Sequence, residues 1–386
     1  MEPTKIPFNR PWMTGEELQN IQEAHSNMHL AGDGPFTQKC HDFLEKLTDT
    51  ERVLLTHSCT AALEMAALLL NLNPGDEVLM PSWTFVSTAN AFALRGAVPV
   101  FVDIRDDTLN MNELLIEEAI TPKTRAIVPV HYAGVSAEMD TILKVANRHG
   151  LAVVEDAAQG VMARYRGRAL GGIGDLGTFS FHETKNVISG EGGALLVNRK
   201  DFELRAEIIR EKGTNRSRFF RGEVDKYTWQ DMGSSYLPGE LIAAFLWAQL
   251  QKAQFITETR LGLWQYYHRE LIELELLGLL RRPVVPVECE HNGHLYYIRL
   301  PSGVDRNLVL EGLKCRGIGV VFHYVPLHSS PAGLEFGRSH GDLPITDLVA
   351  DQLLRLPLWV GMTPEQQDRV VVGLKEVLLR SSTGFR

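Results

Sequence analysis

Two turns in the first quarter of the chain have residue types that suit a ligand with a phosphate and an aromatic ring. Residues 56–63, THSCTAAL, follow an apolar run and open a helical pattern, whose free N–H groups and dipole would attract a phosphate. Residues 81–85, PSWTF, follow the next apolar run and place Trp83 just after that run, as the first turn places its polar residues. Each turn also has an ordinary explanation, because small polar residues are common N-caps and a tryptophan is often a core residue.

An acidic and an amino side chain follow further along the chain. Asp156 comes after the apolar run 151–154, so its carboxylate needs a cation such as a protonated pyridine nitrogen, unless it only caps a helix. Lys185 follows the run 177–182, GTFSFH, and with little solvent around it would attack a carbonyl, although most lysines are surface charges. A phosphate turn, an aromatic ring, an acid and an amine, in this order, match the needs of pyridoxal 5′-phosphate.

The hydrophobic pattern predicts the elements that must hold these segments. Short β-branched runs alternate with longer helical patterns, which is typical of βαβ units and a mostly parallel sheet with helices on both faces. Ligands of such sheets bind at the carboxyl ends of the strands, so the residues just after each strand should be considered together. Strands are expected at 53–55, 77–80, 98–102, 126–130 and 151–154, and helices at 59–72, 84–95, 112–120 and 137–149.

The pattern changes after residue 158. Segments 176–182 and 192–198 are expected to pair as antiparallel strands, because only a glycine-containing turn separates them. A long helix is expected from residue 239 toward 274, with Gly262 as its weak point. The prediction is an α/β protein with a large domain over residues 1–250, followed by a connecting helix and a small α+β domain over 251–386. In the small domain, strands are expected at 295–300 and 319–324, and helices at 306–315 and 363–379.

Composition excludes several classes of protein. The 386 residues carry 39 basic and 48 acidic side chains, a net charge of −9, and no basic block that would follow a nucleic acid. The four cysteines lie far apart without a CxxC pair, so neither a zinc ribbon nor a disulfide framework is indicated. No leader pattern and no run of 18 apolar residues is present, so we expect a cytoplasmic protein without a membrane partner.

Two further motifs suggest ligands but lack the right context. Residues 172–177, GIGDLG, match GxGxxG, yet a strand rather than a helix is expected after them, so a dinucleotide would find no helix start. Residues 291–294, HNGH, lie near Cys289, but one His-x-x-His without further spaced ligands is a weak metal motif. We expect no metal site and interpret this segment as a solvated loop.

A set of nine motifs resembles the DegT/DnrJ/StrS family of pyridoxal-phosphate sugar aminotransferases over nearly the whole chain. Residues 211–237 and the segment GDGPFT at 32–37 are similar to TDP-4-keto-6-deoxyglucose 4-aminotransferases. The resemblance implies the type I aminotransferase fold and a homodimer whose active sites lie at the interface. The motifs are SCTAAL, PSWTFVSTAN, FVDI, PVHYAG, EDAAQ, SFHETKN, GEGGALL, VPLH and LRLPL.

The resemblance also implies a role for individual residues around the cofactor. Lys185 would form a Schiff base with pyridoxal phosphate and later move the proton, while Asp156 would keep the pyridine nitrogen protonated. Trp83 would stack on the ring, and Gln159 would hydrogen-bond on the side of the phenolic oxygen. The phosphate would lie on the backbone of Cys59 and Thr60 and on the hydroxyl of Ser180.

Other residues are implied to contact the substrate or the neighbouring subunit. The chain has Gly-Ser-Ser-Tyr-Leu at 233–237 where the family commonly has Gly-x-Asn-Tyr-Arg, and that asparagine reaches the phosphate of the neighbouring subunit. Ser235 would therefore have to replace it with a shorter hydroxyl. The residues expected to face the sugar are His182, Lys212, Arg216, His323 and Tyr324, with His328 ranked below them.

The function implied by the resemblance is a ping-pong transfer of an amino group from glutamate to C-4 of TDP-4-keto-6-deoxy-D-glucose, giving a TDP-4-amino-4,6-dideoxyhexose. Transfer at C-3 of the sugar and a non-catalytic regulator with the same fold are the alternatives. A dehydratase of this fold has a histidine in place of the lysine, so the presence of Lys185 argues against it.

Overall fold

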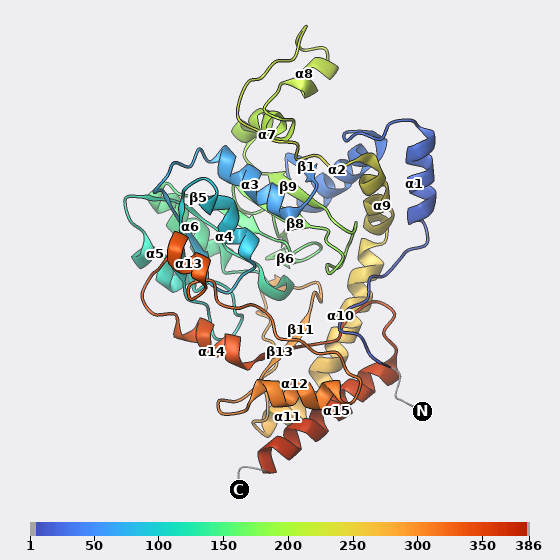
Figure 1. Ribbon diagram of the computed structural model, residues 1–386, viewed down its shortest axis with the longest axis vertical. Helices are drawn as coiled ribbons and strands as arrows, with labels where there is room; N and C mark the ends of the chain where they lie inside the picture. The colour runs from blue at the N-terminus through green and yellow to red at the C-terminus, as the bar shows by residue number, and fades with distance from the viewer. Residues whose placement is uncertain (1–4, 384–386) are drawn as a thin grey trace.

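A mixed β-sheet forms the centre of the larger part of the molecule (Figure 1). The computed structural model describes residues 5–383, and over these residues the sheet has eight strands in the order β1-β9-β8-β5-β4-β2-β3-β12. This confirms the predicted α/β fold with a mostly parallel central sheet. The strands are β1 (Arg52–Thr56), β2 (Glu77–Pro81), β3 (Val98–Val102), β4 (Thr124–Ile127), β5 (Ala152–Asp156), β8 (Leu176–Ser180), β9 (Gly193–Val197) and β12 (Arg338–Ser339).

Strand β9 is antiparallel to both of its neighbours, β1 and β8, and the other pairs of this sheet are parallel. Since β1 and β8 flank the reversed strand, they run in the same direction as each other and as β5. The carboxyl ends of β1, β2, β5 and β8 therefore meet at one edge of the sheet, together with the beginning of β9.

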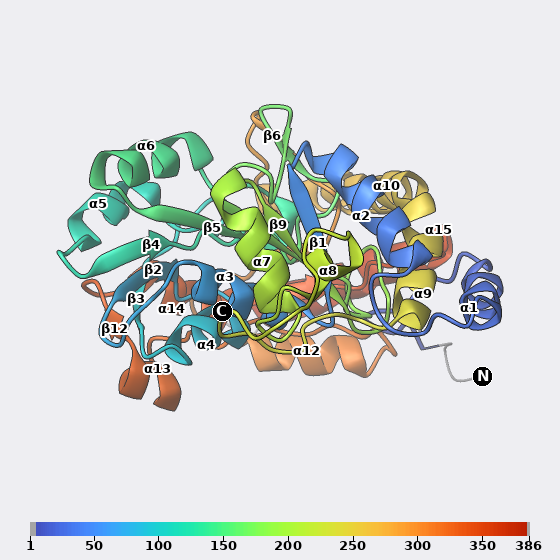
Figure 2. The ribbon, with the colours of Figure 1, turned by 90° about the horizontal axis from the view of Figure 1, so that it is seen from above.

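Alternating side chains of the strands are buried in two different cores, which explains why the strands are apolar throughout. Val53 and Leu55 belong to one core and Leu54 to the other, as expected for a pleated strand covered on both faces. Figure 2 shows the two helix layers on either side of the sheet. One layer contains α2 (Pro35–Thr48), α5 (Ile116–Ala119) and α6 (Met139–His149); the other contains α3 (Cys59–Leu69), α4 (Val86–Ala93) and α7 (Glu203–Arg210).

Helices α9 (Glu240–Gln251) and α10 (Ala253–Glu270) lead from the large sheet to a second core (Figure 1). The helix interruption lies at Lys252, whose φ and ψ are −106° and 8°, and not at Gly262, which continues α10 with open space around it. The second core contains β11 (Tyr296–Arg299) antiparallel to β13 (Leu353–Leu356), with α11 (Ile272–Leu276), α12 (Arg306–Lys314) and α15 (Pro364–Thr383).

Two predicted strands differ from those in the structure. The segment expected as a strand at 319–324 makes one bridge to β13, between Val321 and Arg355, while β11 forms the full ladder with β13. Strand β4 ends at Ile127 rather than at residue 130, since Pro129 has no N–H to continue the ladder. The pattern predicted helix 112–120 as one element, but it is a 3-10 turn (Glu113–Leu115) followed by the short α5.

The two cores are linked by more than the long helices. Ile6, from the first residues, is buried in the second core, and β12 returns from the C-terminal part to pair with β3. The domain division between residues 250 and 251 stays a prediction. In the described part of the chain, no helix has both the length and the apolar character needed to cross a membrane. The remaining elements are α1 (Glu17–Ser26), α8 (Arg216–Phe220), α13 (Pro331–Phe336), α14 (Pro344–Gln352), β6 (Arg164–Tyr165), β7 (Arg168–Ala169) and β10 (Cys289–Glu290).

Candidate active site

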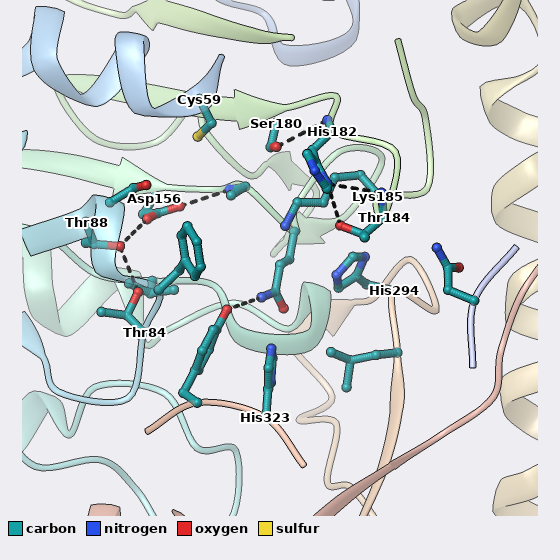
Figure 3. A pocket seen from close by; sticks show the side chains of 18 of the residues that line it. Cys59, Thr84, Thr88, Asp156, Ser180, His182, Thr184, Lys185, His294 and His323 are labelled. Atoms are coloured by element: carbon teal, nitrogen blue, oxygen red, sulfur yellow. Dashed lines mark hydrogen bonds between the residues drawn. The ribbon is translucent and has the colours of Figure 1, made fainter. Parts of the chain in front are cut away.

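A cavity of about 650 Å³ opens at the edge of the sheet where the carboxyl ends of the strands meet. Its wall includes the start of α3 after β1, the ends of β5 and β8, the turn before β9, and segments of the C-terminal core. Figure 3 shows that Asp156, at the end of β5, and Lys185, in the turn after the neighbouring β8, face this one space. The topology thus brings together residues that are widely separated in the sequence.

The start of α3 forms a cradle for an anion. Ser58 is the N-cap and accepts a hydrogen bond from Ala61 N at 3.1 Å, so the N–H groups of Cys59 and Thr60 stay directed beyond the helix end. Thr60 Oγ1 lies 2.7 Å from the hydroxyl of Ser87, which also lines the cavity, as does Ser180. The wall between them is tight: a Cβ added at Gly193 would come within 2.4 Å of Cys59 N.

Asp156 is a nearly buried carboxylate at the end of β5, with 5% of its surface exposed. Thr88 Oγ1 donates a hydrogen bond to its Oδ2 at 2.7 Å, and Ala158 N donates to its Oδ1 at 3.1 Å. Thr84 Oγ1 lies 2.8 Å behind Thr88 Oγ1, so a short chain of hydroxyls orients the acid (Figure 3). Among the described residues it has no cationic partner in a salt bridge, so the site suits a ligand with a cationic nitrogen.

Lys185 lies half-buried in the turn that follows β8, where its backbone N–H donates to His182 O at 2.9 Å. Burial lowers the pKa of its ammonium below the ordinary value, and the charge of Arg355 acts in the same direction, whereas Cys59 and Asp156 oppose the shift. A lower pKa raises the fraction of the neutral amine, which is the form that attacks a carbonyl. The geometry therefore presents an activated amine opposite an acid.

Gln159, His323 and Tyr324 form the wall on the side of the C-terminal core. Gln159 accepts a hydrogen bond from Ala133 N at 2.7 Å and donates one to the Tyr324 hydroxyl at 2.8 Å. The His323 ring stacks on Tyr324 with centroids 3.7 Å apart and shares a hydrogen bond with Tyr132 at 2.8 Å. Burial, with a smaller effect of positive Arg355, lowers the pKa of His323 well below its ordinary value, so its imidazole is neutral.

The expected aromatic contact requires a correction. Trp83 is fully buried and does not line the cavity; it packs behind the wall against Tyr132, His323 and Tyr324. Phe85, two residues later, lines the cavity and has 59% of its surface exposed. The turn after β2 begins α4 at residue 86, which turns Phe85 outward and leaves Trp83 beneath it.

Several predicted site residues lie away from the cavity of this chain. His182 lines the cavity and bonds Thr184 at 2.9 Å, but His328 is held by Ser82 at 2.8 Å outside it. Three others belong to residues 212–235, the projecting segment, whose helix α8 stands out from the body of the molecule (Figure 1). Ser235 there is exposed and pairs with Glu211, to which Arg216 forms a salt bridge at 3.4 Å. Ser235, Lys212 and Arg216 are not part of the cavity wall.

The structure also brings residues to the cavity that the sequence analysis did not select. Arg260, His294 and Arg355 line it from the C-terminal core, and Phe8 and Asn9 come from the first residues of the chain. One signal was present in the sequence, since Arg355 interrupts the apolar run LLRLPL. The residues 291–294 are not a solvated loop, because Asn292 is buried and donates hydrogen bonds to the carbonyls of Gln159 and Val161, each at 2.8 Å.

The glycine-rich loop that contains the GxGxxG motif binds a carboxylate of this chain. The buried Glu155 accepts hydrogen bonds from the N–H groups of Gly171, Ile173 and Gly174 at 2.6–2.9 Å, and its Oε2 lies 2.8 Å from His131. The loop is thus occupied from within the fold. Across the described residues, no group of three or more potential ligands could hold a metal ion.

Comparisons with known proteins agree with this geometry. The model of the DegT/DnrJ/EryC1/StrS aminotransferase family matches residues 11–375. An uncharacterized protein of Methanocaldococcus jannaschii, MJ1066, is 33% identical over 380 residues, which is 97% of each chain. The aminotransferase TlmJ from Streptoalloteichus hindustanus is 28% identical, with a TM-score of 0.89 over 97% of this chain and 99% of that one.

A further solved structure contains a cofactor. NtdA from Bacillus subtilis, with bound cofactor PMP, is 30% identical with a TM-score of 0.87, over 98% of this chain and 86% of that one. These likenesses, over nearly all of the described structure, show both the fold and the chemistry. The chain belongs to the DegT/DnrJ/EryC1/StrS aminotransferase family and is a sugar aminotransferase that depends on pyridoxal phosphate.

Proposed function

We propose that the enzyme transfers the amino group of glutamate to C-4 of TDP-4-keto-6-deoxy-D-glucose and releases a TDP-4-amino-4,6-dideoxyhexose. The observation that carries the transfer chemistry is the placement of Lys185 and Asp156 in one cavity beside the free start of α3. The similarity of residues 211–237 to 4-aminotransferases of this sugar supports the position on the ring.

The residues of the cavity fit pyridoxal phosphate. The helix start at Cys59 and Thr60 with Ser180 suits its phosphate, the exposed face of Phe85 suits its ring, and Asp156 lacks a cation that its pyridine nitrogen can provide. When bound, the cofactor withdraws electrons from the carbon that carries the amine and makes its C–H bond acidic.

Each polar residue then has a defined task. Lys185, with its lowered pKa, would hold the cofactor through its amine and would move the proton at the reacting carbon of a bound substrate. Asp156 would keep the pyridine nitrogen protonated, and Thr88 holds the carboxylate of Asp156 by a hydrogen bond. Gln159 orients the Tyr324 hydroxyl at the side of the cavity, and neutral His323 supports it. In this assignment Phe85 takes the stacking role first given to Trp83.

A second copy of the chain would complete the site. The projecting segment exposes large aromatic side chains, including Trp229, which is 80% exposed, and Phe220. A homodimer would cover these rings and bring Ser235, Lys212 and Arg216 to the cavity of the other subunit, where they would bind phosphate groups. The four cysteines are free, which suits the reducing cytoplasm that we propose as the location.

The visible absorbance of the purified enzyme with pyridoxal phosphate tests this function. Glutamate should bleach the band, and the 4-keto-6-deoxysugar nucleotide should restore it, while Lys185→Ala should form no lysine-dependent band. Proton NMR of the product then locates the new amine. An amine at C-3 would overturn the position, and a band that glutamate leaves unchanged would overturn the donor.

A further inference from the structure

Arg355 places an uncompensated guanidinium in the cavity wall. It lies on β13 and lines the cavity, and its Cζ is 4.8 Å from the ring centre of Phe8, which also lines the cavity. Its Nε and Nη2 donate to Phe322 O at 3.2 and 3.1 Å, which fixes the plane of the group. No described residue accepts a hydrogen bond from its Nη1.

The surroundings of Arg355 contain no carboxylate partner. It takes part in no salt bridge within the described residues, and burial lowers its pKa below the ordinary value, with only Tyr132 and Tyr324 acting against that shift. A half-buried cation without a counter-ion is unfavourable, and a planar guanidinium matches an oxyanion with two oxygens. The group is therefore set up for an anionic part of a ligand.

Arg260 is the other arginine of the cavity wall, but it is more deeply buried than Arg355, with 5% of its surface exposed. Its Nε donates to Gly293 O at 3.1 Å and its Nη2 to His294 O at 2.5 Å, so it holds the loop that carries His294. The charge of Arg355, in contrast, reaches Lys185, where it helps to lower the pKa of the amine. Of the two guanidinium groups, Arg355 is the less buried one, and its charge is the one that acts on Lys185.

The chemistry of the two substrates decides which anion Arg355 receives. In an amino acid, the carbon that carries the amine is bonded directly to the α-carboxylate. In a nucleotide sugar that reacts at C-4, the diphosphate is attached at C-1, on the opposite side of the ring. Arg355 and Lys185 line the same cavity, and both substrates react at Lys185. The α-carboxylate is therefore the anion that the donor brings next to the reacting nitrogen, whereas the diphosphate stays across the sugar ring.

We propose that Arg355 binds the α-carboxylate of the amino-acid donor and thereby selects the donor for the first half of the reaction. This inference rests on the proposed function, because it presupposes that an amino acid supplies the amine. It adds a specificity-determining residue whose effect is confined to one of the two half-reactions.

The test measures each half-reaction separately by the cofactor absorbance of the holoenzyme. Arg355→Gln should raise the apparent Kd for glutamate about 10- to 100-fold, the range for loss of a hydrogen bond between charged groups, and leave the reaction with the keto sugar within about threefold of the parent. Arg355→Lys should restore part of the affinity, because it keeps a charge without the planar pair of donors. Arg269→Gln, which changes an exposed arginine on α10 that bonds Glu270, is the matched control.

Donor analogues provide a comparison within each variant, independent of its folding. The parent should prefer glutamate over its α-amide by a factor that nearly disappears in Arg355→Gln, whereas the preference over the γ-amide, glutamine, should persist. In Arg355→Gln, the binding of 2-methylglutamate should weaken by the same factor as the binding of glutamate. Because 2-methylglutamate has no α-hydrogen to lose, it measures binding without turnover. Calorimetry with thymidine diphosphate should give the same affinity in both proteins.

Three outcomes would overturn the inference. The first is equal glutamate affinity in the parent and Arg355→Gln. The second is that Arg355→Gln loses the preference for glutamate over glutamine rather than the preference for glutamate over its α-amide. The third is weaker thymidine diphosphate binding as the main effect, which would assign the group to the sugar nucleotide. A parent enzyme that responds to no amino acid would overturn the proposed function itself, which distinguishes that failure from the failure of Arg355 alone.

Discussion

The hydroxyl of Thr88 offers a direct test of how the fold holds the catalytic acid. Thr88→Val keeps the shape of the side chain but removes the O–H that donates to Asp156 Oδ2 at 2.7 Å. Thr84 loses its partner as well, since its hydroxyl lies 2.8 Å from that of Thr88. The buried carboxylate then keeps only the hydrogen bond from Ala158 N.

The size of the effect follows from this geometry. A hydrogen bond to a charged group contributes about 1.5–3 kcal/mol, and about 1.36 kcal/mol corresponds to a factor of ten. If the bond orients Asp156 during proton movement, kcat should fall roughly 10- to 100-fold, while the KM for the sugar nucleotide stays within about threefold. Burial of the unsatisfied oxygen should also lower the free energy of unfolding by about 1–3 kcal/mol.

Single-turnover absorbance with glutamate is the assay, and Thr88→Ser is the control. Serine keeps a hydroxyl at the same position, so it should retain most of the parental rate. Equal rates for Thr88→Val and the parent, in a protein that binds its cofactor normally, would refute the argument that this hydroxyl positions the acid. A loss in Thr88→Ser as large as in Thr88→Val would refute it too, because the methyl group would then be the cause.

Three further predictions concern the acid, the ring contact and the amine. Asp156→Asn should lower the rate of amine transfer more than a hundredfold without weakening nucleotide-sugar binding, measured by calorimetry. Phe85→Ala should weaken cofactor binding severalfold, as expected for loss of a stacking contact of about 0.5–1.5 kcal/mol. Trp83→Phe should instead lower the melting temperature and leave cofactor affinity unchanged. Fluorescence titration with the cofactor measures the affinity of both variants. Folding lowers the pKa of Lys185 from 10.5, so just below pH 10.5 the folded apoenzyme binds fewer protons at this group than the unfolded chain does. The free energy of unfolding of the parent should therefore rise with pH through this window, compared with that of Lys185→Met. If urea titrations gave the same pH dependence for both proteins, the lowered pKa would be contradicted.

Residues just after the predicted strands could be assigned to the site because their position follows from topology alone. Asp156 ends β5 and Lys185 lies in the turn after the neighbouring β8, so the pattern of strands and helices was enough to bring them together. The choice between Trp83 and Phe85 was beyond this reasoning. Both are aromatic residues in one turn, and which of them faces the cavity depends on where α4 begins.

The C-terminal wall could not be predicted for a different reason. Arg355 and Arg260 reach the cavity only because β13 pairs with β11 and the second core folds against the large sheet, and these are contacts over long sequence separations. The interruption at Lys252 also has no local signal, whereas Gly262 has one and stays helical, since its neighbours supply the packing. Helix propensity is a weak guide where tertiary contacts decide.

The two acids at the end of β5 show how the chain fixes its own alignment. Consecutive side chains of a strand point to opposite faces, so Glu155 is held by the glycine-rich loop while Asp156 faces the cavity. If β5 slipped by one residue, the longer acid would enter the cavity and the shorter one would fail to reach the loop. The hydrogen bonds to Glu155 therefore fix the register of β5 and with it the position of the Asp156 carboxylate. An exchange of the two residues should abolish activity although charge and composition are unchanged.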